Sequence, residues 1–357
     1  MIENENNKTK SRRSHHVNIP IFIPHLGCPN NCVFCNQRSI SGKREFVKEN
    51  VRKEIEQAMS TIDTGTCLPE IAFFGGSFTG IDRELMIYLL GIAQEYIDSG
   101  RVGSIRMSTR PDYISDEIMK ILSDYTVGTI ELGIQSMDEN VLQTCKRGHS
   151  VADSVNACRL IKQAGYSLIG QMMVGLPGAD NESEIRTAEK ICSLGADGAR
   201  VYPTVVFRET ELCNMAKSGE YIPLSNEEAI LRTKNVLKVF DRGGVPCIRV
   251  GLCASENLSD ESEVFGGANH SAIGEMAMSL VFRDNIEEKI NSSAAVPEHN
   301  CGLIVYVPRG CTSKASGQKR SNKNYFAEKY GIKNIKILED PALEGYNVHI
   351  VFTGSKK

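Results

Sequence analysis

The chain has 357 residues, a net charge of −3 and 41% hydrophobic residues, an ordinary composition for a globular protein. Its length allows a core of about 250 residues and a smaller second domain. No apolar run approaches the roughly 20 residues of a membrane-spanning helix, which excludes an integral membrane protein and predicts no membrane partner. Residues 1–16 lack an apolar segment behind their charges, so we expect a disordered polar tail rather than a secretion signal.

Short apolar runs alternate with longer amphipathic ones from residue 17 onward. The apolar runs predict buried strands at 17–23, 70–74, 104–108, 129–134, 167–175 and 198–203. Helical spacing occupies 47–62, 82–99, 114–123, 151–164 and 181–194. Six strand-then-helix units in succession indicate a parallel sheet with right-handed crossovers. The predicted fold class is therefore α/β, an incomplete parallel barrel of six βα units.

We place the core at 17–250, where helices at 209–217 and 225–241 and a strand at 245–251 extend it. The pattern changes after residue 250. Residues 251–300 are polar and acidic in part and are expected to form a connecting segment. Strands near 302–307, 334–338 and 346–352 and a helix near 322–330 predict a small α+β domain over 301–357.

The stretch HLGCPNNCVFC places Cys28, Cys32 and Cys35 within eight residues. Pro29, Asn30 and Asn31 favour an irregular loop, so the three sulfurs can surround one centre. A structural zinc site needs a fourth ligand, for which His25 is the nearest candidate, whereas a 4Fe-4S cluster on three thiolates leaves one iron open. From these residues alone, idle thiols, a zinc site and an iron–sulfur cluster all stay open.

Nine further cysteines are scattered along the chain. Twelve cysteines without a signal peptide indicate a reducing compartment, so we expect a cytoplasmic protein without structural disulfides. Most of the nine are interpreted as small buried residues. An alternative second metal site would use Cys247, Cys253, Cys301 and Cys311.

The cysteine spacing, with Phe34 before the third cysteine, resembles the signature of the radical S-adenosylmethionine superfamily. The motif follows the first predicted strand, and the diglycine Gly75–Gly76 follows the second, so both lie on one face of the sheet. The resemblance implies an enzyme with a 4Fe-4S cluster on the three cysteines. Its open iron would chelate S-adenosylmethionine, and an electron from a donor such as ferredoxin or flavodoxin would cleave that molecule to a 5'-deoxyadenosyl radical.

Further motifs at strand ends supply candidate ligands for S-adenosylmethionine. Gly75 and Gly76 let backbone carbonyls approach the ammonium group. Ser108 is a candidate partner of the ribose, and Gln135 lies at the end of the fourth strand. Arg147 suits the carboxylate because its planar fork donates two parallel hydrogen bonds. The sequence does not identify a catalytic residue.

Within the superfamily, ELGIQS, KRGHS, MMVGLPG and YPTVVFRETEL resemble the radical domain of the Elongator catalytic subunit, over roughly residues 17–250. That resemblance implies an Elongator-like enzyme of tRNA modification, here expected without the acetyltransferase domain. One alternative is a radical enzyme acting on a small molecule such as a porphyrinogen, as in the oxygen-independent coproporphyrinogen oxidase group. Another is a non-catalytic metal-binding or RNA-binding protein of the same fold.

The span from Arg309 to Lys336 contains eight basic residues and one acid, Glu328, for a net charge of +7. Tyr325 and Phe326 lie nearby as possible stacking aromatics. Concentrated positive charge beside aromatic rings is typical of nucleic-acid binding, although a solvated face has the same composition. We therefore expect this basic segment to contact tRNA.

Overall fold

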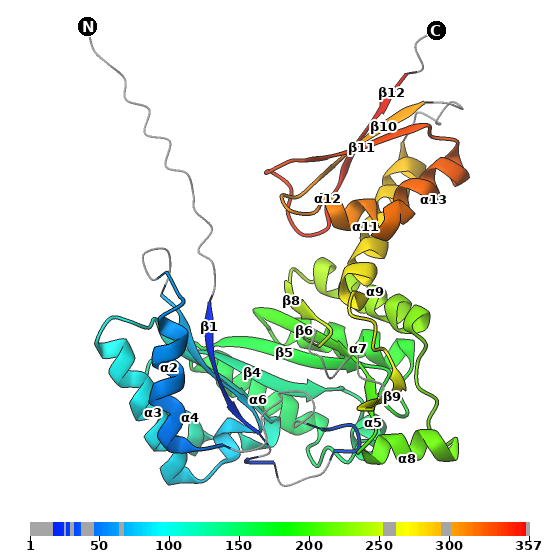
Figure 1. Ribbon diagram of the computed structural model, residues 1–357. Coiled ribbons are helices and arrows are strands. Elements are labelled where there is room, and N and C mark those ends of the chain that lie inside the picture. The colour runs from blue at the N-terminus through cyan, green and yellow to red at the C-terminus, as the bar shows by residue number, and fades with distance from the viewer. Residues whose placement is uncertain are drawn as a thin grey trace, which may run out of the picture.

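The structure is a computed structural model that describes residues 17–24, 26–28, 32–36, 46–63, 68–252, 262–293 and 301–354. Its centre is a curled seven-stranded sheet in the order β1-β2-β3-β4-β5-β6-β8, with every neighbouring pair parallel (Figure 1). The strands are β1 (Asn18–Ile23), β2 (Glu70–Gly75), β3 (Ser104–Thr109), β4 (Val127–Gln135), β5 (Ser167–Val174), β6 (Gly198–Pro203) and β8 (Cys247–Val250). The predicted α/β fold, an incomplete parallel barrel, is confirmed.

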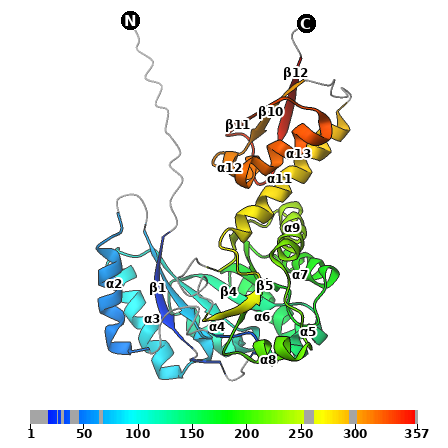
Figure 2. The ribbon, with the colours of Figure 1, turned by 45° about the vertical axis from the view of Figure 1, so that its right-hand side comes forward.

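Helices cover the convex face of this sheet (Figure 2). They are α2 (Val51–Met59), α3 (Arg83–Asp98), α4 (Asp116–Leu122), α6 (Val151–Gln163), α7 (Asn181–Ser193) and α9 (Asn226–Arg242). Alternate strand residues such as Ile71, Phe73 and Met107 point into this layer and are at most 1% exposed. Each such side chain contributes about 1.5–3 kcal/mol by leaving water, so this face fixes the register of the strands.

Two short strands and three helices were not predicted. β7 (Val205–Phe207) and β9 (Val264–Gly267) pair antiparallel beyond the end of β6, and α5 (Glu139–Thr144) and α12 (Thr312–Ser316) are single short turns. The larger omission is α11 (Ile273–Ser292), inside the expected connecting segment. Its apolar residues form no single stripe because successive parts face different partners: Ala277 and Val281 pack near α9, whereas Phe282 and Ile286 belong to the C-terminal core.

The C-terminal appendage is a three-stranded sheet in the order β11-β10-β12, packed on helices. β10 (Gly302–Val307) pairs parallel with β11 (Asn334–Glu339) and antiparallel with β12 (His349–Thr353). α13 (Ser321–Tyr330) and the second half of α11 cover one side, with Phe326 1% exposed at their centre. This is the expected small α+β arrangement, and Figure 1 shows it joined to the half-barrel through α11.

The carboxyl ends of the parallel strands meet at one edge of the half-barrel. Ile23 of β1 stands opposite Gly75 of β2, and the ends of β3, β4 and β5 continue this edge. Loops that leave such an edge form the ligand sites of parallel α/β proteins. Among the described residues, no helix combines the length and the apolar character needed to cross a membrane.

Candidate functional site

The cysteine loop leaves this edge directly after β1. Cys32 is buried, and Cys28 and Cys35 are half-buried. The backbone N–H of Val33 donates to the Cys145 carbonyl at 3.2 Å, at the end of α5. The Val33 carbonyl accepts from the N–H of Leu212 at 2.8 Å, in the first turn of α8 (Glu211–Ser218). Two helices distant in sequence therefore hold the loop against the barrel mouth.

Metal ligation by the three thiols stays a prediction. Across the ranges that the structure describes, no three His, Cys, Asp or Glu side chains are arranged to hold a metal ion. His25, the alternative zinc ligand, lies outside those ranges, as does Cys253 of the alternative second site. The other members of that second site are separated, since Cys301 and Cys311 pack in the C-terminal core and Cys247 packs against the half-barrel. The second metal site is therefore not supported.

The diglycine is needed for the cysteine loop to pack on β2. The N–H of Gly76 donates to the Ile23 carbonyl at 2.9 Å, and the N–H of Ser77 donates to the Leu26 carbonyl at 3.0 Å. A Cβ on Gly76 would lie 1.9 Å from the Leu26 oxygen, closer than any side chain tolerates. Gly75 has φ +114°, which favours glycine. These glycines bring the second strand into direct contact with the loop that carries the thiols.

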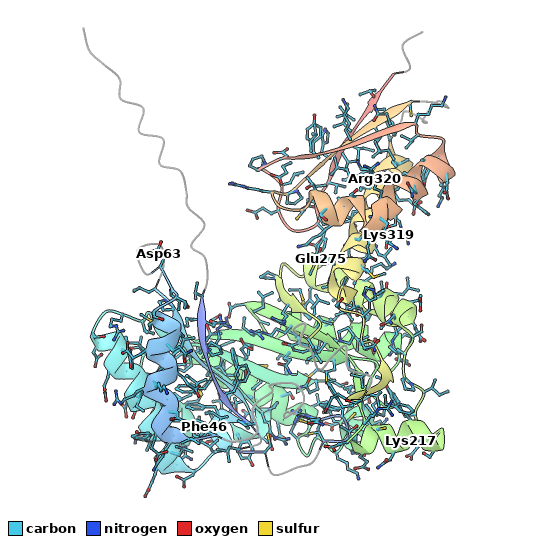
Figure 3. The ribbon with its side chains drawn as sticks, viewed as in Figure 1. Phe46, Asp63, Lys217, Glu275, Lys319 and Arg320 are labelled. Carbon is cyan, nitrogen blue, oxygen red and sulfur yellow. The ribbon has the colours of Figure 1, made fainter. Side chains whose placement is uncertain are left out.

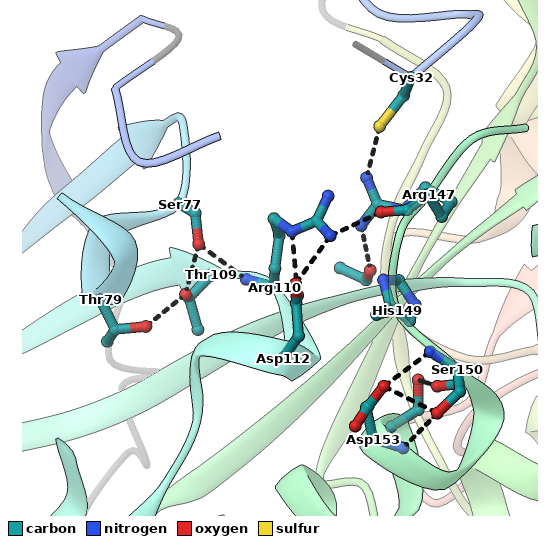
Figure 4. A network of polar contacts seen from close by, with 12 residues as sticks. Cys32, Ser77, Thr79, Thr109, Arg110, Asp112, Arg147, His149, Ser150 and Asp153 are labelled. Carbon is teal, nitrogen blue, oxygen red and sulfur yellow. Dashed lines mark hydrogen bonds and ion pairs between the residues drawn. The ribbon is translucent and has the colours of Figure 1, made fainter. Parts of the chain in front are cut away.

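Arg147 lies at the centre of the site (Figure 4). Its guanidinium is buried and donates from Nη1 to the Cys32 Sγ at 3.3 Å and from Nη2 to the Gly133 carbonyl at 2.8 Å. Burial raises the pKa of the Cys28 thiol, and the positive charges of Arg110 and Arg147 oppose that rise without cancelling it. The two guanidinium groups therefore give the loop positive charge that favours anions, while burial, the larger effect, disfavours the Cys28 thiolate.

Arg110 is a site residue that the sequence analysis missed. It is 3% exposed, and its guanidinium donates to the Asp112 carboxylate at 2.9 Å and from Nη2 to the Arg147 backbone carbonyl at 2.5 Å. It supports the segment that carries Arg147 and places a second cation near Cys28. The available signal was an arginine directly after the third predicted strand, in STRPDY.

Buried hydroxyl groups connect the diglycine segment to the end of β3. Thr109 Oγ1 lies 2.8 Å from Ser77 Oγ and 2.6 Å from Thr79 Oγ1, and the N–H of Arg110 donates to Ser77 Oγ at 3.1 Å (Figure 4). All three hydroxyl residues are at most 3% exposed. Satisfied buried networks of this kind rigidify their surroundings, so the first three strand ends are held as one unit.

Gln135 faces the same region from the end of β4. It is 6% exposed, adopts φ +66°, and its Oε1 has no hydrogen-bond partner within the described part of the chain. A Cβ on Gly133 would lie 3.2 Å from Gln135 Nε2 and 3.5 Å from Arg147 Nη2, so the missing side chain leaves a small cradle between the two. A buried acceptor and a strained backbone are typical of a ligand site.

Ser108 and Phe34 lie apart from this centre. Ser108 is on the concave face of the sheet, where its Oγ is 3.5 Å from Glu131 Oε2. Phe34 packs into an apolar cluster with Val141 and Leu176. The structure therefore brings Cys32, the diglycine, Gln135 and Arg147 to one edge, with Ser108 farther along the barrel wall and Phe34 behind the loop.

The concave face carries a charged network that the sequence analysis also missed. Arg106 donates to Glu70 at 2.8 Å and to Glu131 at 2.7 Å, and Arg200 donates to the same Glu131 oxygen at 2.8 Å. Glu131 is 1% exposed, so these charges compensate one another inside the barrel. The signal was a single charged residue in each of four largely apolar strands, β2, β3, β4 and β6.

His149 is buried beside the site. Its Nε2 lies 3.3 Å from the Ile134 carbonyl, and the ring is 5% exposed. Burial, together with the positive charges of Arg147 and Arg110, lowers the pKa of His149 to about 4. The imidazole is therefore neutral at physiological pH and adds no third cation to the site.

The aromatic residues of the basic segment are used for packing, which corrects the expected stacking role. Phe326 is 1% exposed, and the Tyr325 hydroxyl donates to Glu287 at 2.7 Å. The guanidinium of Arg283 lies 4.7 Å from the centre of the Tyr325 ring. Lys319 and Arg320 are exposed at a turn with φ +52° and φ +63°, and Figure 3 shows both on the appendage. The segment therefore offers charge rather than rings.

Two family models match the sequence in succession. The model of the Radical SAM superfamily matches residues 22–191, and that of the Radical SAM C-terminal domain matches residues 196–280. Together they extend from β1 into α11. The matched span includes the cysteine loop, the diglycine, Gln135 and Arg147.

Relatives with related sequences include proteins of archaea and eukaryotes. Uncharacterized protein MJ0486 of Methanocaldococcus jannaschii is 30% identical over 226 residues, covering 59% of this chain and 68% of that protein. The tRNA uridine(34) acetyltransferase of the same archaeon is 35% identical over 133 residues, covering 36% and 25%. Elongator complex protein 3 of Drosophila melanogaster is 34% identical over 242 residues, covering 57% and 44%. The chain thus spans less than half of each of the last two proteins.

Solved structures show the same fold. The archaeal Methanocaldococcus infernus Elp3 with an N-terminal deletion superposes with a TM-score of 0.58 at 22% identity, covering 77% of this chain and 64% of that one. Streptococcus suis SuiB bound to S-adenosylmethionine gives a TM-score of 0.50 at 12% identity, covering 68% and 52%. At these identities the similarity concerns the fold alone.

Proposed function

The chain belongs to the radical S-adenosylmethionine superfamily, and we propose that it uses this chemistry to modify a nucleotide of a structured RNA, most simply tRNA. It is a radical S-adenosylmethionine enzyme, and the cofactors of this family are a 4Fe-4S cluster and S-adenosylmethionine. The residues that hold them, the RNA substrate and its binding surface are our proposal.

The proposed cluster ligands are Cys28, Cys32 and Cys35. The loop fits an anionic cluster because two buried guanidinium groups lie beside it and one of them donates to a thiol sulfur. When bound, the cluster would supply the electron that cleaves S-adenosylmethionine to a radical. The chain's own contribution is to bury Cys32, to leave one iron without a protein ligand, and to hold the loop through the backbone of Val33.

The proposed S-adenosylmethionine ligands lie next to this loop. The backbone of Gly75 and Gly76 would face the methionine end, and Gln135 and Arg147 line the cradle left by Gly133. The buried Gln135 Oε1 fits an incoming donor such as an ammonium or hydroxyl group. Ser108 would serve the ribose from the barrel wall, and Phe34 supports the loop from behind.

The observation that carries the RNA proposal is the basic segment of the appendage. It has a net charge of +7, and the ion pairs found within the described residues involve Lys314 and Lys329. Lys319 and Arg320 extend into solvent and suit a phosphate backbone. Relatives named as a tRNA uridine(34) acetyltransferase and as Elongator complex protein 3 support the same substrate class. We assign substrate chemistry to 17–250 and RNA binding to 301–357, joined through 251–300.

The proposed setting follows from the chemistry. A cluster that must be reduced requires an electron donor, and we propose ferredoxin or flavodoxin for that role. An oxygen-sensitive cluster and an RNA substrate both suit the cytoplasm.

Anaerobic reconstitution with iron, sulfide, reductant and S-adenosylmethionine tests the proposal. Bulk tRNA should stimulate 5'-deoxyadenosine formation and gain a new nucleoside detectable by mass spectrometry after digestion. Coproporphyrinogen serves as the small-molecule comparison. Stimulation by coproporphyrinogen and not by tRNA would replace the RNA proposal, and a stoichiometric zinc site without iron uptake would remove the radical chemistry as well.

A further inference from the structure

Arg147 contacts a proposed cluster ligand directly, which goes beyond a role in binding S-adenosylmethionine. Its Nη1 donates to the Cys32 Sγ at 3.3 Å, while its Nη2 is fixed on the Gly133 carbonyl at 2.8 Å. Arg147 is 6% exposed and Cys32 is buried, so water screens the contact poorly. A guanidinium directed at sulfur gains most when that sulfur is an anion.

The position of Arg147 is determined by its surroundings. Arg110 donates to the Arg147 backbone carbonyl, and Arg110 is itself oriented by Asp112 at 2.9 Å. The Gly133 carbonyl holds the other end of the guanidinium. Arg147 is thus fixed at its backbone carbonyl and at its Nη2. A donor fixed in this way keeps its N–H on the sulfur when the charge of the cluster changes, whereas a flexible surface arginine would move.

Charge decides what such a contact does. A 4Fe-4S cluster on three thiolates is an anion, and one-electron reduction makes it more negative. A buried cation with an N–H on a ligand sulfur stabilises the reduced form more than the oxidised form, which raises the reduction potential. The electron comes from the external donor, Arg147 stays protonated, and no proton moves.

We propose that Arg147 is a positioning and tuning residue for the cluster, raising its reduction potential through the Cys32 sulfur, with Arg110 holding Arg147 in place. This inference rests on the cluster part of the proposed function and is independent of the RNA substrate.

A redox titration of the reconstituted cluster, followed by electron paramagnetic resonance without S-adenosylmethionine and without RNA, tests the proposal. In Arg147→Met, the ratio of reduced to oxidised cluster at a given applied potential should fall about tenfold, equivalent to a midpoint lower by about 59 mV. Arg147→Gln keeps an N–H donor and loses the charge, so its midpoint should lie between those of wild type and Arg147→Met. Arg101→Met removes the same charge from the exposed side of the half-barrel and should leave the midpoint unchanged.

The outcomes separate the two proposals. A wild-type midpoint in both Arg147 variants, with weakened S-adenosylmethionine binding alone, would overturn the tuning role and leave the proposed function standing. If Arg147→Met holds no iron, Arg147→Gln carries the test. A wild-type protein that takes up no iron would remove the radical chemistry and the tuning role together, whereas absence of tRNA stimulation would leave the titration unaffected.

Discussion

The half-barrel and the appendage carry their charges in opposite ways. In the half-barrel, Arg106 and Glu131 are buried on the concave face, and together with the half-buried Glu70 and Arg200 their charges neutralise one another. In the appendage, Lys319 and Arg320 extend into solvent at a turn, and the nearby rings are packed away. The first arrangement fixes side-chain positions through direct hydrogen bonds. In the proposed function, the second would attract a large anion through its charge, with little dependence on geometry. The half-barrel is thus the region of fixed side-chain geometry, and the appendage is the region of exposed charge.

The largest expected effect comes from a substitution at Gly76, in the half-barrel. Gly76→Val would place its Cβ 1.9 Å from the Leu26 carbonyl, so the cysteine loop has to leave β2. We expect iron content after reconstitution to fall at least about tenfold, measured by colorimetric iron assay on folded protein. Gly91→Ala, at a position in α3 where a Cβ meets nothing within 4 Å, should keep full iron content and stabilise the fold by about 0.5–1 kcal/mol. Equal iron content in both variants would contradict the packing role.

The second prediction compares a buried acid with a partly exposed one. Glu131→Gln leaves Arg106 and Arg200 without their shared charge and should lower the free energy of unfolding by about 3–5 kcal/mol in urea. Glu287→Gln removes the acid that accepts from Lys329 in the appendage and should cost a small fraction of that, because water screens the pair. Equal losses of unfolding free energy in the two variants would show that the buried network around Glu131 stabilises the protein no more than the partly exposed pair of Glu287 and Lys329.

The sequence predicted the elements of both regions well, for a physical reason. Buried parallel strands are apolar runs with helical segments between them, and this pattern is local, so ten strands could be placed from it. α11 was missed because its faces are buried by two different bodies, which erases the stripe that marks an amphipathic helix. β7 and β9 were missed because they pair across a long stretch of chain and each is very short.

The sequence predicted the site residues that directly follow predicted strands. It did not predict the contacts between residues that are far apart in the sequence. The three cysteines and the diglycine follow strands directly, so their common edge could be inferred. Arg110 reaches the carbonyl of Arg147 from 37 residues away, and no local pattern connects them. The stacking role assigned to Phe326 was wrong because its burial depends on α11, an element that the sequence did not reveal.

A smaller expected effect concerns the pH dependence of the free energy of unfolding, which should differ between a histidine in the half-barrel and one in the appendage. His149 in the half-barrel has its pKa lowered to about 4, by burial first and then by Arg147 and Arg110. Between about pH 6.5 and about pH 4 the unfolded chain therefore binds a proton that the native state refuses, so stability falls as pH falls. From pH 7 to pH 5, His149 should account for a loss of roughly 2 kcal/mol in the free energy of unfolding.

Urea unfolding of the apo protein at both pH values measures that loss. His149→Gln should remove it, whereas His349→Gln in the appendage should not, because the His349 ring is exposed in the folded protein. Should the His149 variant keep the full pH dependence of the wild type, the acid sensitivity must arise elsewhere in the chain.

The smallest effect on the protein itself tests the broad region. Lys319→Glu and Arg320→Glu reverse the charge at the exposed turn, and Lys323→Glu reverses it at a half-buried position in the first turn of α13. Together they should leave folding, iron content and uncoupled cleavage of S-adenosylmethionine at wild-type levels. Affinity for tRNA should fall about tenfold or more, and the slope of log K against log salt should shrink by about 2 to 3, since each lost phosphate contact removes about 0.7–0.9. Fluorescence anisotropy across a salt series gives both quantities.

The control reverses three exposed lysines on the helical side of the half-barrel, Lys53, Lys120 and Lys190, and should change the slope little if binding is confined to the appendage. Equal shifts in the two triple variants would mean that tRNA responds to the overall charge of the protein, and the division between a precise half-barrel and a broadly binding appendage would no longer hold.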